Sequence, residues 1–256
     1  MSGTASRRWR TGWALPALFA LIAFSTFVGL GTWQLQRKAW KEVLIDTLER
    51  RLAASPVNLP PRARWPSLDP PDDEFLRVNF SAAFLPGQEA LVYGVGSALR
   101  SDVSGPGYWV FAPAKLAGGD LVVVNRGFVP EGRQDQAVRS AAQILGTIEM
   151  VGVMRWPEPR GPFTAREDVA RNLWFVRDHM AIAAAKGWGE VAPFYVELES
   201  PQPAGGLPRA GALKLDLRNA HLQYAITWYG LAAVVAVMFG FWLRGRPRAG
   251  AQAPSL

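Results

Sequence analysis

The chain has 256 residues, of which 49% are hydrophobic and 19% charged, and its formal net charge is +7. This length suffices for one folded domain together with membrane-spanning segments. The absence of cysteine excludes disulfides, thiolate metal sites, covalent c-type haem attachment and cysteine nucleophiles, and two histidines are too few for a multi-histidine metal site. Nucleic-acid binding is not predicted, because the middle of the chain has no basic stripe with interleaved aromatic residues.

The first predicted element is a membrane-spanning helix at residues 13–33, which follows a basic tail at residues 1–12. Its 21 residues contain no Lys, Arg, Asp or Glu, and at 1.5 Å per residue they reach about 30 Å, the thickness of a bilayer's hydrocarbon core. Trp13 and Trp33 mark its two ends, as is typical of membrane interfaces. A cleaved signal peptide, with residues 23–25 as its cleavage triplet, is the alternative. The apolar run continues beyond that triplet, which favours an uncleaved anchor.

The helix is predicted to continue past the membrane as an amphipathic segment that ends near Ala54. Apolar residues recur there at three- and four-residue steps in residues 40–52. Their stripe is expected to lie on the domain or on the membrane surface, and Asp46 and Arg50 are spaced for an i,i+4 ion pair. Six prolines in residues 56–71 then predict an extended linker rather than a helix or a central strand.

Residues 34–220 are predicted to form one extracytoplasmic domain with a β-rich core. Runs of strand-forming residues alternate with turns, and the Ala-Gly-Gly-Asp sequence at residues 117–120 indicates a hairpin. A helix is expected at residues 178–186, with Asp178 as its N-cap and Gly187 beyond its end. The predicted strands are residues 74–85, 89–99, 108–116, 121–129, 146–155, 173–176, 194–198 and 212–217.

A second membrane-spanning helix is predicted at residues 221–243, before a basic tail at residues 244–256. It contains 23 residues without Lys, Arg, Asp or Glu. The two tails carry six arginines and no acidic residue, so the positive-inside rule places both termini in the cytoplasm, where anionic lipid is their expected partner. The predicted fold is an α+β membrane protein in which two transmembrane helices flank one β-rich domain. In a bacterium the protein would lie in the inner membrane with this domain in the periplasm.

Small residues predict that the two spans pack against each other. Ala232, Ala236 and Gly240 form a small-xxx-small ridge on the second span, and Ser25 and Gly29 supply a matching pair on the first.

His221 is the main candidate for a functional side chain, because an ionisable residue that opens a membrane span is costly and usually functional. In a helical projection Trp228 falls about 20° to one side of His221 and Ala232, a member of the small-residue ridge, about 20° to the other. The imidazole is therefore expected to face the seam between the spans. A neutral imidazole there could be the axial ligand of a haem iron, with Trp228 and Tyr224 as flat walls. The alternative is an interfacial histidine that hydrogen-bonds a neighbour or a lipid headgroup. His179 is expected to be a surface or capping histidine, and the acidic run at residues 72–74 a solvated loop.

Seven short motifs occur in order between about residue 28 and residue 243. They are GTWQLQRK at 31–38, PVNLP at 56–60, GPGYWV at 105–110, VNRGFVP at 124–130, RWPE at 155–158, NLWFVRD at 172–178 and HLQYAITW at 221–228. Together they resemble the surfeit locus protein 1 family, the assembly factors of cytochrome c oxidase. The resemblance implies an integral membrane protein of the respiratory chain that helps install haem a in the oxidase's catalytic subunit, beside other assembly factors. It also implies that the histidine matching His221 is a haem a ligand.

The chain departs from the family pattern at two places. Ala220 stands where the family usually has an asparagine before the histidine, which removes a side chain that could hydrogen-bond to His221. Glu167 and its neighbours replace a Pro-x-Asn-Asp-like run. Arg126 and Arg155 are secondary candidates beside strand ends, where each could face a haem propionate. Structural ion pairing is the alternative for both arginines.

Two hypotheses from different classes follow. The first is a non-enzymatic, chaperone-like assembly factor that receives or positions haem a beside the oxidase. The second is a membrane-anchored scaffold that binds oxidase subunits through its β-rich domain without binding haem. An enzyme that acts on haem or lipid has almost no support in the residues.

Overall fold

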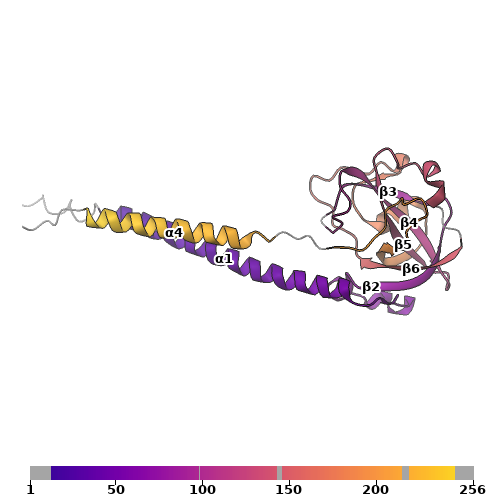
Figure 1. Cartoon of the computed structure of the whole chain (residues 1–256), viewed down its shortest axis with the longest axis horizontal. Coiled ribbons are helices and arrows are strands. Elements are labelled where there is room, and N and C mark those ends of the chain that lie inside the picture. The colour runs from indigo at the N-terminus through magenta and orange to yellow at the C-terminus, as the bar shows by residue number, and fades with distance from the viewer. Residues whose placement is uncertain (1–12, 98, 143–145, 215–218, 246–256) are drawn as a thin grey trace, which may run out of the picture. The chain divides into compact units, whose positions relative to one another are not determined.

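The computed structural model describes residues 13–97, 99–142, 146–214 and 219–245, which separate into two compact units (Figure 1). The helical unit comprises the described residues up to Leu44 and from residue 219 onward. The β unit comprises the described residues from Ile45 to residue 214.

Two helices carry the predicted membrane spans. Helix α1 runs from Ala14 to Ala53 over 40 residues, and helix α4 runs from His221 to Arg244 over 24 residues. Both are long and apolar enough to cross a bilayer. The predicted helical continuation of the first span to about Ala54 is confirmed, because α1 ends at Ala53. The predicted Asp46–Arg50 ion pair is wrong, because Arg50 Nε donates instead to the main-chain oxygen of Asp46 at 3.1 Å.

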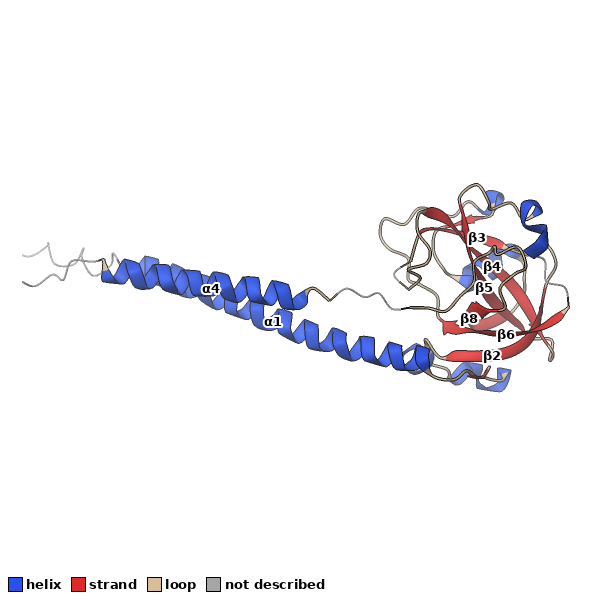
Figure 2. Cartoon of the chain, in the orientation of Figure 1, coloured by secondary structure: helices blue, strands red, loops and turns tan. Residues whose placement is uncertain are grey.

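The described residues of the β unit form one sheet of eight strands. The strands are β1 (Val57–Asn58), β2 (Arg77–Phe84), β3 (Ala90–Val95), β4 (Pro106–Leu116), β5 (Leu121–Pro130), β6 (Thr147–Arg155), β7 (Leu173–Trp174) and β8 (Val191–Ser200). Their order is β1-β2-β6-β8-β5-β4-β3-β7, and an additional β2–β4 pairing closes five of them into a barrel (Figure 2). The β5–β8 pair is parallel, whereas the other four pairs of the ring are antiparallel.

Strands β4, β5 and β8 are buried on both faces over most of their length, which explains why they lack a clean alternation of apolar and polar residues. Strand β2 differs, because its buried apolar residues alternate with half-buried polar ones. Val122 and Val124 of β5 belong to a core cluster to which all five barrel strands contribute, and the intervening Val123 belongs to a second cluster. Helix α3 (His179–Lys186) covers this second cluster through Ile182 and Ala183. The sheet therefore carries one core inside the ring and another outside it.

Several boundaries differ from the sequence prediction. The hairpin is confirmed, because Lys115 of β4 pairs with Leu121 of β5. Helix α3 is confirmed with Asp178 as its N-cap and Gly187 as its C-cap, where a φ of +67° favours glycine. The strand predicted at 212–217 is wrong over residues 212–214, which are not in a strand; its remaining residues lie outside the described part. The predicted strands at 74–85, 89–99 and 173–176 are shorter in the structure, and the one at 194–198 is longer.

The segment predicted as an extended linker contains regular structure. Besides β1 it holds a 3-10 helix, η1 (Arg62–Ser67), and a one-turn helix, α2 (Pro70–Asp73). Proline at the first turn of a helix costs no hydrogen bond, so a proline-rich sequence is compatible with such short helices. Trp65 of η1 is buried in the barrel core, which anchors this segment to the β unit. Two further 3-10 helices, η2 (Ala137–Ala142) and η3 (Val169–Arg171), lie in loops.

Candidate functional site

The apolar parts of α1 and α4 pack together within the helical unit, at a seam that differs in detail from the predicted one. Ala225 and Ala232 of α4 are buried, as is Gly31 of α1. A Cβ added at Gly31 would lie 2.9 Å from Cζ of Tyr229, so the absence of a side chain lets the tyrosine ring lie on α1. The prediction for Gly29 is wrong, because a Cβ there would meet nothing within 4 Å.

Hydroxyl groups and aromatic rings fix the register of this seam. Thr32 Oγ1 donates to the main-chain oxygen of Val28 at 2.9 Å, and it lies 3.0 Å from the hydroxyl oxygen of Tyr229. Since threonine has one hydroxyl proton, Tyr229 is the donor in the second bond. One turn away, the rings of Phe27 and Trp228 stack with centroids 5.7 Å apart. The two helices are therefore joined by directional contacts as well as by close packing.

His221 lies at the first position of α4 and faces α1, as the helical projection predicts. Its Nδ1 is 2.7 Å from Oε1 of Gln34. In the part of the chain that the structure describes, the other ring nitrogen, Nε2, has no hydrogen-bond partner. The imidazole is thus hydrogen-bonded through one ring nitrogen, while the other has no partner among the described residues. Histidines that bind metal ions commonly have this arrangement.

The two aromatic residues proposed beside His221 differ in their surroundings. Trp228 is half-buried against Phe27, whereas 56% of the surface of Tyr224 is exposed. Ala220 is the N-cap of α4 and provides no side-chain cap. Ala220 has no side chain that could accept a hydrogen bond from the imidazole, and the acceptor is instead Oε1 of Gln34 on the other helix.

Sequence reasoning missed Gln34, Gly31 and Tyr229, although a signal was present. Phe27, Gly31 and Gln34 follow one another at steps of four and three residues, which places them on one face of a helix. A helical projection of residues 27–34 alone therefore indicates the face of the first span that meets the second.

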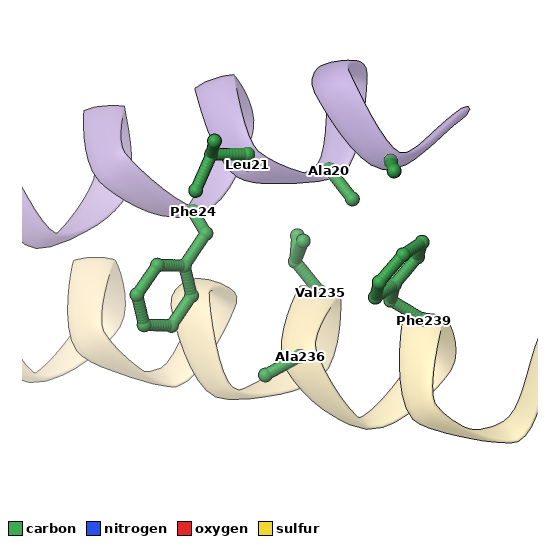
Figure 3. A pocket seen from close by; sticks show the side chains of 7 residues that line it. Ala20, Leu21, Phe24, Val235, Ala236 and Phe239 are labelled. Atoms are coloured by element: carbon green, nitrogen blue, oxygen red, sulfur yellow. The ribbon is translucent and has the colours of Figure 1, made fainter. Parts of the chain in front are cut away.

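Farther along the same helix pair lies an apolar groove of about 280 Å³ (Figure 3). Ala236, which the predicted ridge included, lines this groove and is exposed. It is 15 residues after His221, or about 22 Å along α4. The groove offers no nitrogen or oxygen ligand from its side chains, which are those of Ala17, Ala20, Leu21, Phe24, Val235, Ala236 and Phe239.

Arg155, a secondary candidate, ends strand β6 in a buried ion-pair network of the β unit. Its Nε donates to Glu74 Oε1 at 3.0 Å, its Nη1 lies 3.6 Å from Glu197 Oε2, and its guanidinium stacks over the ring of Phe75. Burial opposes the charge, but Glu197 and Glu74 are among the neighbours that raise the pKa of Arg155 above its ordinary value. The solvated loop predicted at residues 72–74 is therefore wrong for Glu74, whose carboxylate belongs to this network.

The network continues through Glu197 to a second arginine. Glu197 Oε1 accepts hydrogen bonds from Arg177 Nη1 and from Asn125 Nδ2, both at 3.2 Å. The Arg177 guanidinium also stacks on Trp109, 4.5 Å from the ring centroid. These contacts connect β5, β6, β8 and the segment before α3. Arg155 therefore takes part in structural ion pairs, which is the alternative that the sequence left open for it.

Arg126 is also buried, within β5 rather than at its end. Its guanidinium lies 4.8 Å from the centroid of the Phe84 ring, and its Nη1 is 3.9 Å from Glu89 Oε2. Glu89 in turn accepts a hydrogen bond from Arg139 at 2.5 Å. Burial lowers the pKa of Arg126 below its ordinary value, although the carboxylate of Glu89 opposes the shift. At the other departure from the family pattern, Glu167 forms an ion pair with Arg160.

His179 is not a surface histidine, so that prediction is wrong. Its side chain is fully buried, and its Nε2 is 2.9 Å from the main-chain oxygen of Ala192. Burial lowers the pKa of His179 to about 4, against the opposing effects of the Ala192 hydrogen bond and of Asp178. The capping role at this helix belongs to Asp178, which accepts from the main-chain nitrogens of Met180 and Ala181. Among the described residues, no three His, Asp or Glu side chains form a cluster that could hold a metal ion.

Comparison with known proteins agrees with the motif resemblance. The model of the SURF1 family matches residues 21–233. The SURF1-like protein of Monosiga brevicollis is 36% identical over 235 residues, which cover 88% of this chain and 87% of that protein. Surfeit locus protein 1 of Homo sapiens is 35% identical over 239 residues, covering 89% and 77%. The Rattus norvegicus protein of the same name is 33% identical over 231 residues, covering 86% and 73%. The chain therefore belongs to the SURF1 family.

Proposed function

We propose that this protein is a membrane-anchored assembly factor for cytochrome c oxidase that holds haem a for installation in the catalytic subunit. The observation that carries the proposal is the state of His221. The imidazole lies against the facing helix, is tethered through Nδ1 to Gln34, and has no hydrogen-bond partner at Nε2 among the described residues.

The proposed setting is the inner membrane of a cell, with α1 and α4 as its two spans. Their length and apolar composition support membrane insertion. The purely basic tails support cytoplasmic termini, so the β unit would be periplasmic. In this orientation His221 opens the second span at its outer end, near the level of the lipid headgroups.

The residues present fit haem a as a transient cargo. Haem iron accepts a neutral imidazole nitrogen as an axial ligand, and Nε2 of His221 offers one. Trp228 presents a flat ring about two helical turns along α4 from His221, already packed on Phe27. Arg126 and Arg155 are left out of the proposed site, since carboxylates and aromatic rings of the β unit already contact both guanidinium groups.

The test is the optical spectrum of the full-length protein, purified in detergent from cells that make haem a. We expect a haem absorption band in the parent protein and its loss in His221→Ala. Gln223→Ala is the matched control, because Gln223 lies on the same helical turn, is exposed, and should retain the band. A band of equal strength in His221→Ala would refute the assignment of His221.

A colourless parent protein that co-purifies with oxidase subunits would contradict haem handling and identify the anchored scaffold instead. In that case co-purification should survive His221→Ala, because the scaffold hypothesis places the binding surface on the β unit. Loss of the haem band together with unchanged co-purification in His221→Ala is the result that the proposal predicts.

A further inference from the structure

We propose that Gln34 is a positioning residue that fixes the tautomer of His221 and so keeps Nε2 available as a ligand. This inference rests on the proposed function for its purpose, but the tautomer can be measured without haem. The bond joins two helices across 187 residues of sequence, so it forms only when the helices pack in this register.

The direction of the hydrogen bond follows from the atoms involved. Oε1 of Gln34 is an amide oxygen and can only accept, so the proton between it and Nδ1 of His221 belongs to the imidazole. A neutral imidazole carries one N–H, so Nε2 is left with its lone pair. His179 adopts the opposite form, because its Nε2 faces the carbonyl oxygen of Ala192 and must carry the proton there. The chain thus contains one histidine of each tautomer.

Fixing the tautomer matters for ligation in two ways. Without an acceptor at Nδ1, the imidazole exchanges between tautomers, and the form protonated at Nε2 cannot bind iron through that nitrogen. An acceptor at Nδ1 also orients the ring and makes Nε2 more basic, and removing such a partner usually costs 10- to 100-fold in metal affinity. Since Ala220 offers no hydrogen-bonding side chain, this role falls to Gln34.

The seam holds Gln34 in place. Gln34 follows Gly31 by three residues on the same face of α1, and Gly31 is the point at which the Tyr229 ring contacts α1. The Thr32–Tyr229 hydrogen bond lies in the same turn. Rotation or sliding of α1 would therefore break the contact at Gly31 and the hydrogen bond to His221 together.

The experiment uses the full chain, labelled with ¹⁵N-histidine and free of haem, in lipid nanodiscs at about pH 8, where a free imidazole is neutral. With two histidines in the chain, His221→Ala assigns both sets of nitrogen signals. We expect His221 to be protonated at Nδ1 and His179 at Nε2. Gln34→Leu should shift His221 to a mixture of tautomers, whereas Gln34→Glu should keep the proton on Nδ1, because a carboxylate also accepts.

Gln36→Leu is the matched control, since Gln36 is the same residue type on the same helix and is exposed. It should leave both histidines unchanged. A parent His221 protonated at Nε2, or one that does not respond to Gln34→Leu, would overturn the inference.

Titration with haem a then separates the two proposals. Affinity should fall 10- to 100-fold in Gln34→Leu and recover in Gln34→Glu. If the tautomers behave as expected and haem a fails to bind the parent protein, the proposed function fails while the tautomer control by Gln34 stands. If haem a binds the parent and Gln34→Leu equally well, the role of Gln34 in ligation fails and the haem proposal stands.

Discussion

Replacing Gly31 with alanine should separate the two apolar helices. The added Cβ would lie 2.9, 3.0 and 3.1 Å from three ring carbons of Tyr229, so it would press on the ring. The ring cannot easily move aside, because its hydroxyl is bonded to Thr32. Overpacking of this kind typically costs 1–3 kcal/mol, so the equilibrium between packed and separated helices should shift by roughly 5- to 150-fold toward separation.

Thiol cross-linking measures this shift, because the chain has no cysteine of its own. Cysteines placed at Phe27 and Trp228, whose rings stack across the seam, would be joined by a short bifunctional thiol reagent in nanodiscs. Gly31→Ala should slow cross-linking markedly, whereas Gly29→Ala should not, since its Cβ meets nothing within 4 Å. Equal cross-linking rates in the two variants would refute the close approach of Tyr229 to Gly31.

Three further predictions concern stability. The pKa of His179 is about 4 in the folded chain, against 6.5 for an ordinary histidine. The unfolded chain therefore binds more protons than the folded chain between these two pH values. The free energy of unfolding should consequently fall by up to about 3 kcal/mol as the pH drops from 6.5 to 4. Thermal unfolding against pH measures this loss, which His179→Gln should flatten. In urea unfolding, Glu197→Gln should cost about 3 kcal/mol because it leaves the buried Arg155 and the partly buried Arg177 short of a carboxylate, whereas the exposed Glu190→Gln should cost under about 1 kcal/mol. If the two variants lose equal stability, the Glu197 network does not support the fold. Tyr229→Phe removes the hydrogen bond to Thr32, which is worth roughly 1 kcal/mol, so the cross-linking rate of the helix pair should fall about fivefold. An unchanged cross-linking rate would contradict that hydrogen bond.

The two long helices could be predicted from sequence because each contains an uninterrupted, uncharged apolar segment of the length that a bilayer would require, which is visible without any long-range contact. The contacts between the helices could not be predicted as reliably. Gly29 and Gly31 both satisfy a rule that looks for small residues, and only the position of the Tyr229 ring distinguishes them. The role of Gln34 could not be predicted for the same reason, since it depends on which residue of the other helix Gln34 faces.

The β unit shows a similar limit. Its strands could be located approximately, but closure of the barrel depends on pairings between distant segments, such as the parallel pairing of Val124 with Val196 and the pairing of Ala82 with Leu116. No local pattern encodes these pairings. The place of His179 at a helix start predicts exposure, whereas α3 packs this first turn against Ala192 of β8. Glu74 looked solvated because its partner, Arg155, lies 81 residues away in sequence.

The proposal that Nε2 of His221 coordinates the iron of haem a can be examined by resonance Raman spectroscopy of the reduced, haem-loaded protein, which detects the iron–nitrogen bond itself. The iron–histidine stretching band should shift when the protein is made with ¹⁵N-histidine, and it should disappear in His221→Ala. The other histidine, His179, is fully buried in the β unit, so it should not supply the ligand. A band that does not respond to the isotope, or one that persists in His221→Ala, would contradict the claim.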